Sequence, residues 1–362
     1  MFETRRKRTE QGCTEKEFKV KCADGYKFNA VITCPENTRK LVIYVNGSGP
    51  VTSRTLRKFS DGRIISYHKL FADEFAKRGI AYCSYSARGV TEGKKAPLFC
   101  EIDKKEYKTA LPSNSVSDVE CLVNHLREKH GIDCPVYLLG WSEGTIISPL
   151  VAARGNVEIS GLFLAGYCNE NLKDILTWQL RSGESAMLNM RKMFDYDKKG
   201  YITKQDYEED RKNAIETVLG NAEFSALDKN GDGILTAEDF ISADYLNSIF
   251  DAIGRNDDEW LENNYPLPLT SGWFKEHFSL TPNRETLPKL DIPIHIFHGE
   301  FDANIPVSQM WDIEKTFKEK GKNNLTVHYF EEHDHNLNYG LYMSKGEISE
   351  GLQELFDTAE KI

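Results

Sequence analysis

The sequence lacks the features that would place the protein in a membrane or in an oxidising compartment. Its longest apolar runs, 41–45 and 146–153, are far shorter than the roughly 20 residues that cross a bilayer. No apolar segment of a secretory signal follows the basic cluster 5–8, which we expect to be a frayed, solvated terminus. The eight cysteines contain no CxxC pair, so we expect neither a disulfide framework nor zinc. These absences predict a cytoplasmic protein with no membrane partner.

The chain also lacks an excess of positive charge. Its formal net charge is −10, which argues against nucleic-acid binding, because a phosphate backbone requires a basic face. The same charge disfavours a strongly anionic substrate unless a local basic pocket overrides it. With 40% hydrophobic and 28% charged residues, the composition is typical of a soluble globular protein. A small molecule is the expected partner, and the oligomeric state is left open.

Strand and helix signals alternate through the first half of the chain and return near its end. An Asp-Gly turn at 24–25 joins two β-rich runs into an expected hairpin. A helix is expected to begin at Ser115, where Ser115-x-x-Asp118 has the pattern of a capping box. This alternation predicts an α/β fold, with a mostly parallel sheet covered by helices on both faces. The expected strands are 17–21, 27–33, 41–45, 80–85, 136–139, 162–164, 292–297 and 325–330, and the later helices are 308–319 and 348–359.

The segment between these two halves has a different character. Strand signals disappear, and the sequence becomes helical and acidic with two Asp-rich loops. We therefore assign residues 1–169 and 286–362 to one α/β core and 170–285 to an all-helical cap inserted into it. Aromatic residues such as Trp260 and Trp273 lie near the end of the cap and suit a lid over an apolar ligand pocket.

The sharpest catalytic signal is the motif Gly140-Trp141-Ser142-Glu143-Gly144. It follows an expected buried strand and precedes an expected helix, which is the context of a GxSxG nucleophile elbow. A serine hydroxyl is a weak nucleophile, so it needs a general base that is oriented by a carboxylate. Ser142 is therefore the candidate nucleophile.

Two strand ends supply the base and the acid in the order that such an elbow requires. Asp302 follows the strand 292–297, and His335 follows the last strand. Glu300 and His333 are the rivals. Asp302 is preferred because Glu300 falls earlier in its turn, and His335 because it lies deeper in the loop, which leaves His333 a surface or supporting histidine.

An acyl-transfer site also needs backbone N–H groups that face the developing oxyanion. The amide of Glu143, directly after the nucleophile, is one expected donor. The second is expected from the glycine turn Asn46-Gly47-Ser48-Gly49-Pro50 after the strand 41–45, with Ser48 as the candidate.

These segments resemble α/β-hydrolases of the dienelactone-hydrolase and serine-aminopeptidase type. The resemblance lies in the elbow 140–144, in 46–50, in Phe75-Ala76-Lys77-Arg78-Gly79-Ile80-Ala81 and in Arg88-Gly89-Val90, and it extends over about 15–170 and 286–345. It implies the α/β-hydrolase fold and a carboxylic-ester hydrolase, with peptidase or thioesterase activity as alternatives. The chain departs from the family pattern at Ser86, Thr91 and Trp141, none of which belongs to the expected triad.

The two Asp-rich loops of the cap have the pattern of paired EF-hands. Loop 228–239 places side-chain oxygens at positions 1, 3 and 5, a glycine at the sharp turn and a backbone carbonyl at position 7. It closes on aspartate instead of the usual glutamate, which should weaken Ca²⁺ binding and relatively favour Mg²⁺. In loop 195–206, Lys199 occupies a ligand position, so we expect no metal there. The candidate ligands are Asp228, Asn230, Asp232, Ile234 and Asp239.

The resulting hypothesis is an ester hydrolase that works through an acyl-enzyme and needs no catalytic cofactor. Ser142 attacks, His335 transfers the proton and Asp302 orients His335. Peptidase, thioesterase and acyltransferase activities would use the same residues. The alternative from another class is a metal-responsive binding protein, in which the core is a scaffold and the EF-hand-like pair is the working part.

Overall fold

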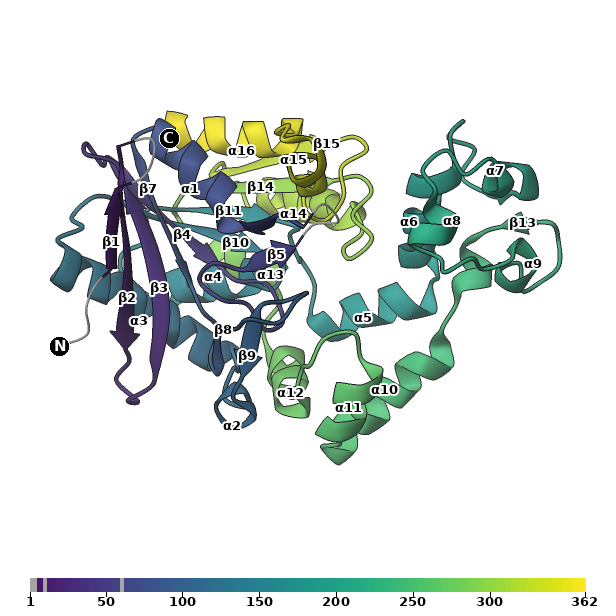
Figure 1. Cartoon of the computed structure of the whole chain (residues 1–362), viewed down its shortest axis with the longest axis horizontal. Coiled ribbons are helices and arrows are strands. Elements are labelled where there is room, and N and C mark those ends of the chain that lie inside the picture. The colour runs from purple at the N-terminus through teal and green to yellow at the C-terminus, as the bar shows by residue number, and fades with distance from the viewer. Residues whose placement is uncertain (1–4, 9–11, 59–61) are drawn as a thin grey trace.

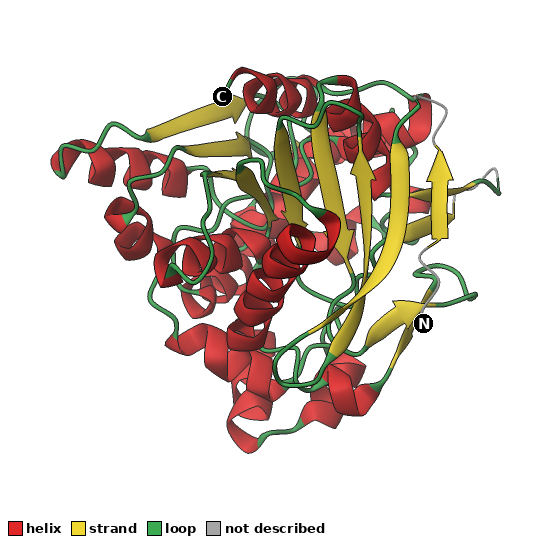
Figure 2. Cartoon of the chain, turned by 90° about the vertical axis from the view of Figure 1, so that its left-hand side faces the viewer, coloured by secondary structure: helices red, strands yellow, loops and turns green. Residues whose placement is uncertain are grey.

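The computed structural model describes residues 5–8, 12–58 and 62–362, and nine strands of this described chain form one twisted sheet (Figures 1 and 2). The strands are Arg5–Arg8 (β1), Thr14–Lys21 (β2), Lys27–Cys34 (β3), Lys40–Val45 (β4), Ile80–Tyr85 (β7), Val136–Trp141 (β10), Gly161–Ala165 (β11), Ile294–Gly299 (β14) and Leu325–Phe330 (β15). Their order is β1-β2-β3-β7-β4-β10-β11-β14-β15. β1, β2, β3 and β7 pair antiparallel, and every pair from β7 to β15 is parallel.

Helices cover both faces of the sheet, because two apolar clusters lie on its opposite sides. The helices of the core are His68–Lys77 (α1), Lys104–Tyr107 (α2), Pro112–His130 (α3), Gly144–Arg154 (α4), Ser308–Glu319 (α14), Tyr339–Lys345 (α15) and Glu350–Lys361 (α16). One cluster joins the sheet to α3, α4 and α14, and the other joins it to α1 and α16. Two short antiparallel pairs lie outside the sheet: Leu56–Lys58 (β5) with Ile64–Ser66 (β6), and Val90–Glu92 (β8) with Cys100–Ile102 (β9).

Most expected elements occur where the sequence pattern places them, and two expectations are corrected. α3 begins at Pro112, three residues before the expected start at Ser115, because proline at the first helical position needs no N–H partner. The basic N-terminus was expected to fray, but Arg5–Arg8 pairs with Thr14–Glu17 as an edge strand. Within the described chain, no helix combines the length and apolarity that a bilayer-crossing segment needs.

The insertion is helical apart from a two-residue ladder that the sequence pattern does not predict. Its elements are Leu172–Arg181 (α5), Glu184–Phe194 (α6), Ile202–Thr203 (β12), Lys204–Glu209 (α7), Ala214–Thr217 (α8), Phe224–Leu227 (α9), Ile234–Leu235 (β13), Ala237–Phe240 (η1), Ala243–Arg255 (α10), Asp258–Asn264 (α11) and Ser271–Ser279 (α12). Asn283–Thr286 (α13) and Leu287–Lys289 (η2) lead back into the core. β12 and β13 are antiparallel, so the two Asp-rich loops lie side by side.

The insertion contains two apolar clusters of its own. One is formed by α5, α10, α11 and α12 and includes Ile249 and Phe274. The other is formed by α6, α7, α8, α9 and the β12–β13 ladder, and it includes Phe194 and Phe224. We call this second part the distal lobe (residues 184–240). Figure 1 shows the distal lobe standing away from the sheet, beyond α5 and α10.

Candidate active site

Ser142 lies in the sharp turn between β10 and α4. Its φ is 54°, a left-handed conformation that a serine adopts only under local constraint. Its amide donates to Ala165 O at 3.0 Å, and its carbonyl accepts from Thr145 N at 2.8 Å. A Cβ on Gly144 would lie 2.1 Å from Val45 O, so this position of the motif requires glycine. The turn therefore holds the serine at the end of the sheet, directly before the positive N-terminus of α4.

Asp302 and His335 come together from the loops after β14 and β15. His335 Nδ1 lies 2.8 Å from Asp302 Oδ2, and the carboxylate is buried. Asp302 Oδ1 accepts from the amides of Asn304 (2.8 Å) and Ile305 (3.0 Å). Because the carboxylate accepts, Nδ1 carries the proton and Nε2 is left free to act as a base.

Electrostatics favour the ion-pair form of this pair. Burial would lower the pKa of His335, but the charge and hydrogen bond of Asp302, with a contribution from Asp334, outweigh burial and raise it. Burial likewise opposes ionisation of Asp302, yet His335 and the amide of Asn304 hold the pKa of Asp302 below its ordinary value. The protonated form of His335 is thus stabilised by Asp302.

The contacts in these two loops distinguish Asp302 from Glu300 and His335 from His333. The Glu300 side chain is exposed, whereas Asp302 contacts the histidine. The sequence analysis left His333 as a surface or supporting histidine, and the structure shows it buried. Its Nδ1 lies 2.7 Å from Glu331 O, and its Nε2 accepts from Gly351 N at 3.2 Å. His333 therefore connects the loop to the start of α16.

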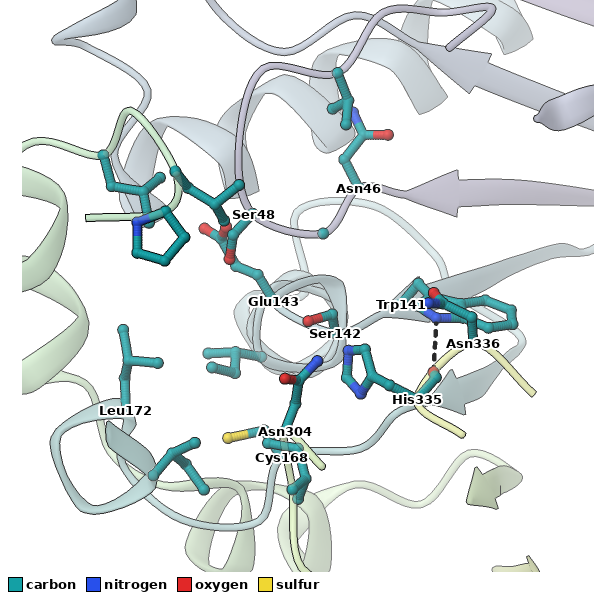
Figure 3. A pocket seen from close by; sticks show the side chains of 18 of the residues that line it. Asn46, Ser48, Trp141, Ser142, Glu143, Cys168, Leu172, Asn304, His335 and Asn336 are labelled. Carbon is teal, nitrogen blue, oxygen red and sulfur yellow. Dashed lines mark hydrogen bonds between the residues drawn. The ribbon is translucent and has the colours of Figure 1, made fainter. Parts of the chain in front are cut away.

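A glycine outside the motif makes room for the base. Gly166, after β11, has a φ of 60°, and a Cβ there would lie 2.6 Å from Cε1 of His335. Trp141, one of the departures from the family pattern, donates from Nε1 to the His335 carbonyl at 3.2 Å (Figure 3). The motif residue before the nucleophile thus supports the loop of the histidine.

Ser142, His335, Ser48 and Glu143 line one cavity of about 470 Å³ (Figure 3). The Ser142 hydroxyl and the His335 ring form no hydrogen bond with each other in this structure. Such contacts often tighten only when substrate binds, so this geometry is compatible with a base. A Cβ on Gly47 would lie 3.3 Å from that of Ser142, which places the glycine turn 46–50 against the nucleophile. The oxyanion role of the Ser48 and Glu143 amides stays a prediction.

The side chain of Glu143 is held by the insertion, a contact that the sequence analysis missed. Its Oε1 accepts from Nε1 of Trp273 at 2.9 Å and lies 2.9 Å from Nε2 of His277, both on α12. The three groups are largely buried. These bonds fix the carboxylate, and with it the residue whose amide is an expected oxyanion donor.

The insertion also contacts the loops of the acid and the base. Lys192 on α6 lies 2.7 Å from Asp334 Oδ2 and 3.1 Å from Asn338 Oδ1, beside His335. Ser185 donates to Ala303 O at 2.6 Å, next to Asp302. The histidine loop includes Glu332, Leu337 and Asn338 at φ between 50° and 57°, so it depends on such external contacts.

The two Asp-rich loops differ in what their carboxylates contact. In loop 195–206, Lys199 Nζ lies 2.7 Å from Asp206 and 3.3 Å from Asp197, so an ammonium group occupies the acidic cluster. In loop 228–239, the donors are uncharged: Asp228 accepts from Gly231 N (2.8 Å), Asp239 from Lys229 N (3.0 Å) and Asp232 from the Asn230 side-chain amide (3.1 Å).

Loop 228–239 offers the oxygen donors that Ca²⁺ and Mg²⁺ prefer. Among the described residues, however, no three or more His, Cys, Asp or Glu side chains gather as a metal site. Occupancy by Ca²⁺ or Mg²⁺ through Asp228, Asn230, Asp232, Ile234 and Asp239 therefore stays a prediction, as does the EF-hand nature of the pair.

Solved structures share this architecture at low sequence identity. A highly thermostable carboxyl esterase from Bacillus coagulans is 18% identical, with 96% of each chain covered and a TM-score of 0.51. A lipase in an open form is 12% identical over 96% of this chain and 97% of that one (TM-score 0.52). An esterase from Pyrococcus furiosus is 11% identical over 97% and 92% (TM-score 0.51). No protein-family model and no curated protein matches the sequence. The α/β-hydrolase fold is confirmed.

Proposed function

We propose that this chain is a serine hydrolase that cleaves carboxylic esters through an acyl-enzyme. The observation that carries the proposal is the 2.8 Å contact between Nδ1 of His335 and Oδ2 of the buried Asp302, because His335 and Ser142 line the same cavity. Ester hydrolysis is also the activity named for the esterases among the solved structures of this fold.

In the proposed reaction, Ser142 Oγ attacks the ester carbonyl while its proton passes to Nε2 of His335. Asp302 stabilises the imidazolium, and the amides of Ser48 and Glu143 donate to the oxyanion. Collapse of the tetrahedral intermediate releases the alcohol, which takes the proton from His335. Water, activated by the same base, then attacks the acyl-enzyme and returns Ser142 and the acid product.

Turnover of p-nitrophenyl esters of increasing acyl length tests the proposal, with the wild type and Ser142→Ala compared at equal folded concentration. We expect turnover by the wild type and a loss of about 10³-fold or more in the variant. Matched amide and thioester substrates, and an added acceptor alcohol, separate peptidase, thioesterase and acyltransferase activities. A chain that binds metal with a change of shape but turns over none of these substrates would be the binding protein instead.

A further inference from the structure

We propose that Arg57 is the anion-binding end of the catalytic cavity and that the ester cleaved at Ser142 carries a carboxylate. The inference rests on the proposed function and adds the substrate class. Arg57, on β5, is the one lysine or arginine among the described residues that line this cavity. The net charge of −10 disfavours an anionic substrate unless the site has a local basic group, and Arg57 provides that group.

The guanidinium of Arg57 lacks a carboxylate partner among the residues that the structure describes. Its Nη1 donates to Leu56 O at 3.0 Å. Its ionisable neighbours are the Cys100 thiol and the Tyr67 and Tyr339 phenols, whose pKa values burial raises, so they carry no charge at neutral pH. Burial lowers the pKa of Arg57, although the group stays protonated at neutral pH. A partly buried cation without a counter-ion is costly unless a ligand provides one.

Two other arginines that are shielded from solvent pair with carboxylates. Arg54 pairs with Glu15 at 3.0 Å, and Arg88 pairs with Asp118 at 2.6 Å. The cavity has one carboxylate among its described residues, that of Glu143, and it is engaged by α12 instead. Arg57 therefore differs from these two arginines, because it faces a cavity and no carboxylate of the described residues compensates its charge.

The surroundings of Arg57 favour a single carboxylate. His68, which also lines the cavity, has its pKa lowered to about 3 by burial and by Arg57, so it is neutral and adds no second charge. One planar guanidinium matches the two oxygens of a carboxylate, whereas a phosphate dianion would need further cations.

The other side of the cavity is apolar, which leaves room for the hydrocarbon part of the same substrate. The leucines and isoleucine that line it from the insertion are Leu172, Ile175, Leu176, Leu267 and Leu269. In the view of Figure 3, Leu172 lies on one side of Ser142 and Asn336 on the other. Arg57 lies near Tyr67 and Tyr339, whose rings pack with centroids 4.3 Å apart, and Tyr339 follows Asn336 closely in the chain. The scissile carbonyl would thus lie between an apolar end and a charged end.

Matched pairs of esters test this assignment. One pair is p-nitrophenyl adipate monoester and its methyl-capped neutral form, with the carboxylate on the acyl side. The other is 4-carboxyphenyl butyrate and its methyl-capped form, with the carboxylate on the alcohol side. We expect the wild type to prefer the carboxylate member of one pair, which identifies the side that reaches Arg57.

The matching variants are Arg57→Met, Arg57→Lys and the control Lys58→Met, which removes a charge from the same strand at an exposed position. Arg57→Met should raise KM for the preferred carboxylate ester by roughly 10- to 100-fold, as expected for a lost charge-assisted contact, and leave the neutral ester within about twofold. Arg57→Lys should retain part of the preference, and Lys58→Met should retain all of it. An equal loss on both members, or no preference in the wild type, would overturn the assignment.

A binding measurement keeps this inference separate from the proposed function. Calorimetry of adipic acid monoamide against Ser142→Ala, compared with hexanamide, needs no turnover. We expect the monoamide to bind more tightly, with an advantage that salt weakens and Arg57→Met removes. Binding without turnover of any ester would contradict only the proposed function. Ester turnover with equal binding of the two amides would contradict only the role of Arg57.

Discussion

The sheet core and the insertion differ in how they are held together and in what they bring to the cavity. The core has two extended apolar clusters, one on each face of the sheet, and it holds Ser142, Asp302 and His335. The insertion has two smaller clusters and reaches these segments through polar contacts, such as Trp273–Glu143 and Lys192–Asp334. In the proposed mechanism, the core therefore supplies the reacting groups and the insertion supports the segments that carry them.

The largest effect should come from the core. Asp302→Asn keeps the volume of the side chain but removes the charge that fixes the tautomer of His335, so we expect kcat to fall by about 10⁴-fold. Steady-state kinetics with a p-nitrophenyl ester measures it. Glu300→Gln, two residues earlier and exposed, is the matched control and should retain activity. Loss of activity in the control with retention in Asp302→Asn would reverse the assignment of the acid.

The contact between α12 and the nucleophile turn should have the next largest effect. Trp273→Phe removes the N–H that donates to Glu143 and keeps an aromatic ring in place. We expect kcat to fall by roughly tenfold with little change in KM, since a misplaced oxyanion donor acts mainly on the transition state. Trp260→Phe, in the same apolar cluster but without a contact to Glu143, should behave like the wild type. Equal losses in both variants would indicate only weaker packing.

A smaller effect is expected from the distal lobe, and the pH profile should detect it. The base works when His335 is neutral, so kcat/KM rises with pH through the pKa of His335, which Asp302 and Asp334 raise. His298, Asp302 and Asp334 are the titratable groups that act electrostatically with it, and Lys192 compensates Asp334.

Lys192→Met removes the cation that compensates the charge of Asp334. It should move the acid limb to higher pH, by less than about one unit because both partners are partly exposed. Asp334→Asn should move it to lower pH. The control is Lys198→Met, which breaks the exposed ion pair with Glu332 in the same loop and should leave the limb in place. A common shift in all three variants would exclude the specific role of Lys192.

Metal binding should have the smallest effect. The account predicts at most one Ca²⁺ or Mg²⁺ per chain, in loop 228–239, and a rise in Tm of a few degrees at millimolar metal. Asp228→Ala should abolish the rise, and Asp195→Asn should not, because Lys199 already compensates the first loop. Calorimetric titration of the three proteins measures the stoichiometry. Binding that survives Asp228→Ala would place the metal elsewhere.

Sequence order and local pattern were sufficient for the core. Ser142, Asp302 and His335 each follow a recognisable strand, and the ends of parallel strands meet at one edge of the sheet. The helix at Ser308–Glu319 was predicted with its observed bounds. The start of α3 was missed although Pro112 carried a usable signal, because a serine three residues later resembled a cap.

The contacts between core and insertion could not be predicted in this way. Trp273 and Glu143 are 130 residues apart, and Lys192 and Asp334 are 142 residues apart. No local periodicity encodes such pairs, because they depend on how the insertion packs on the sheet. The position of Arg57 at the cavity could not be predicted from the sequence either, because its short strand β5 carries no motif.

The acyl-enzyme is the most direct test of the whole account. Turnover of p-nitrophenyl butyrate is quenched with acid in the steady state, and the peptides are examined by mass spectrometry. The account predicts a butyryl group on Ser142, absent from Ser142→Ala. Turnover without any adduct on Ser142, or undiminished turnover by Ser142→Ala, would contradict it.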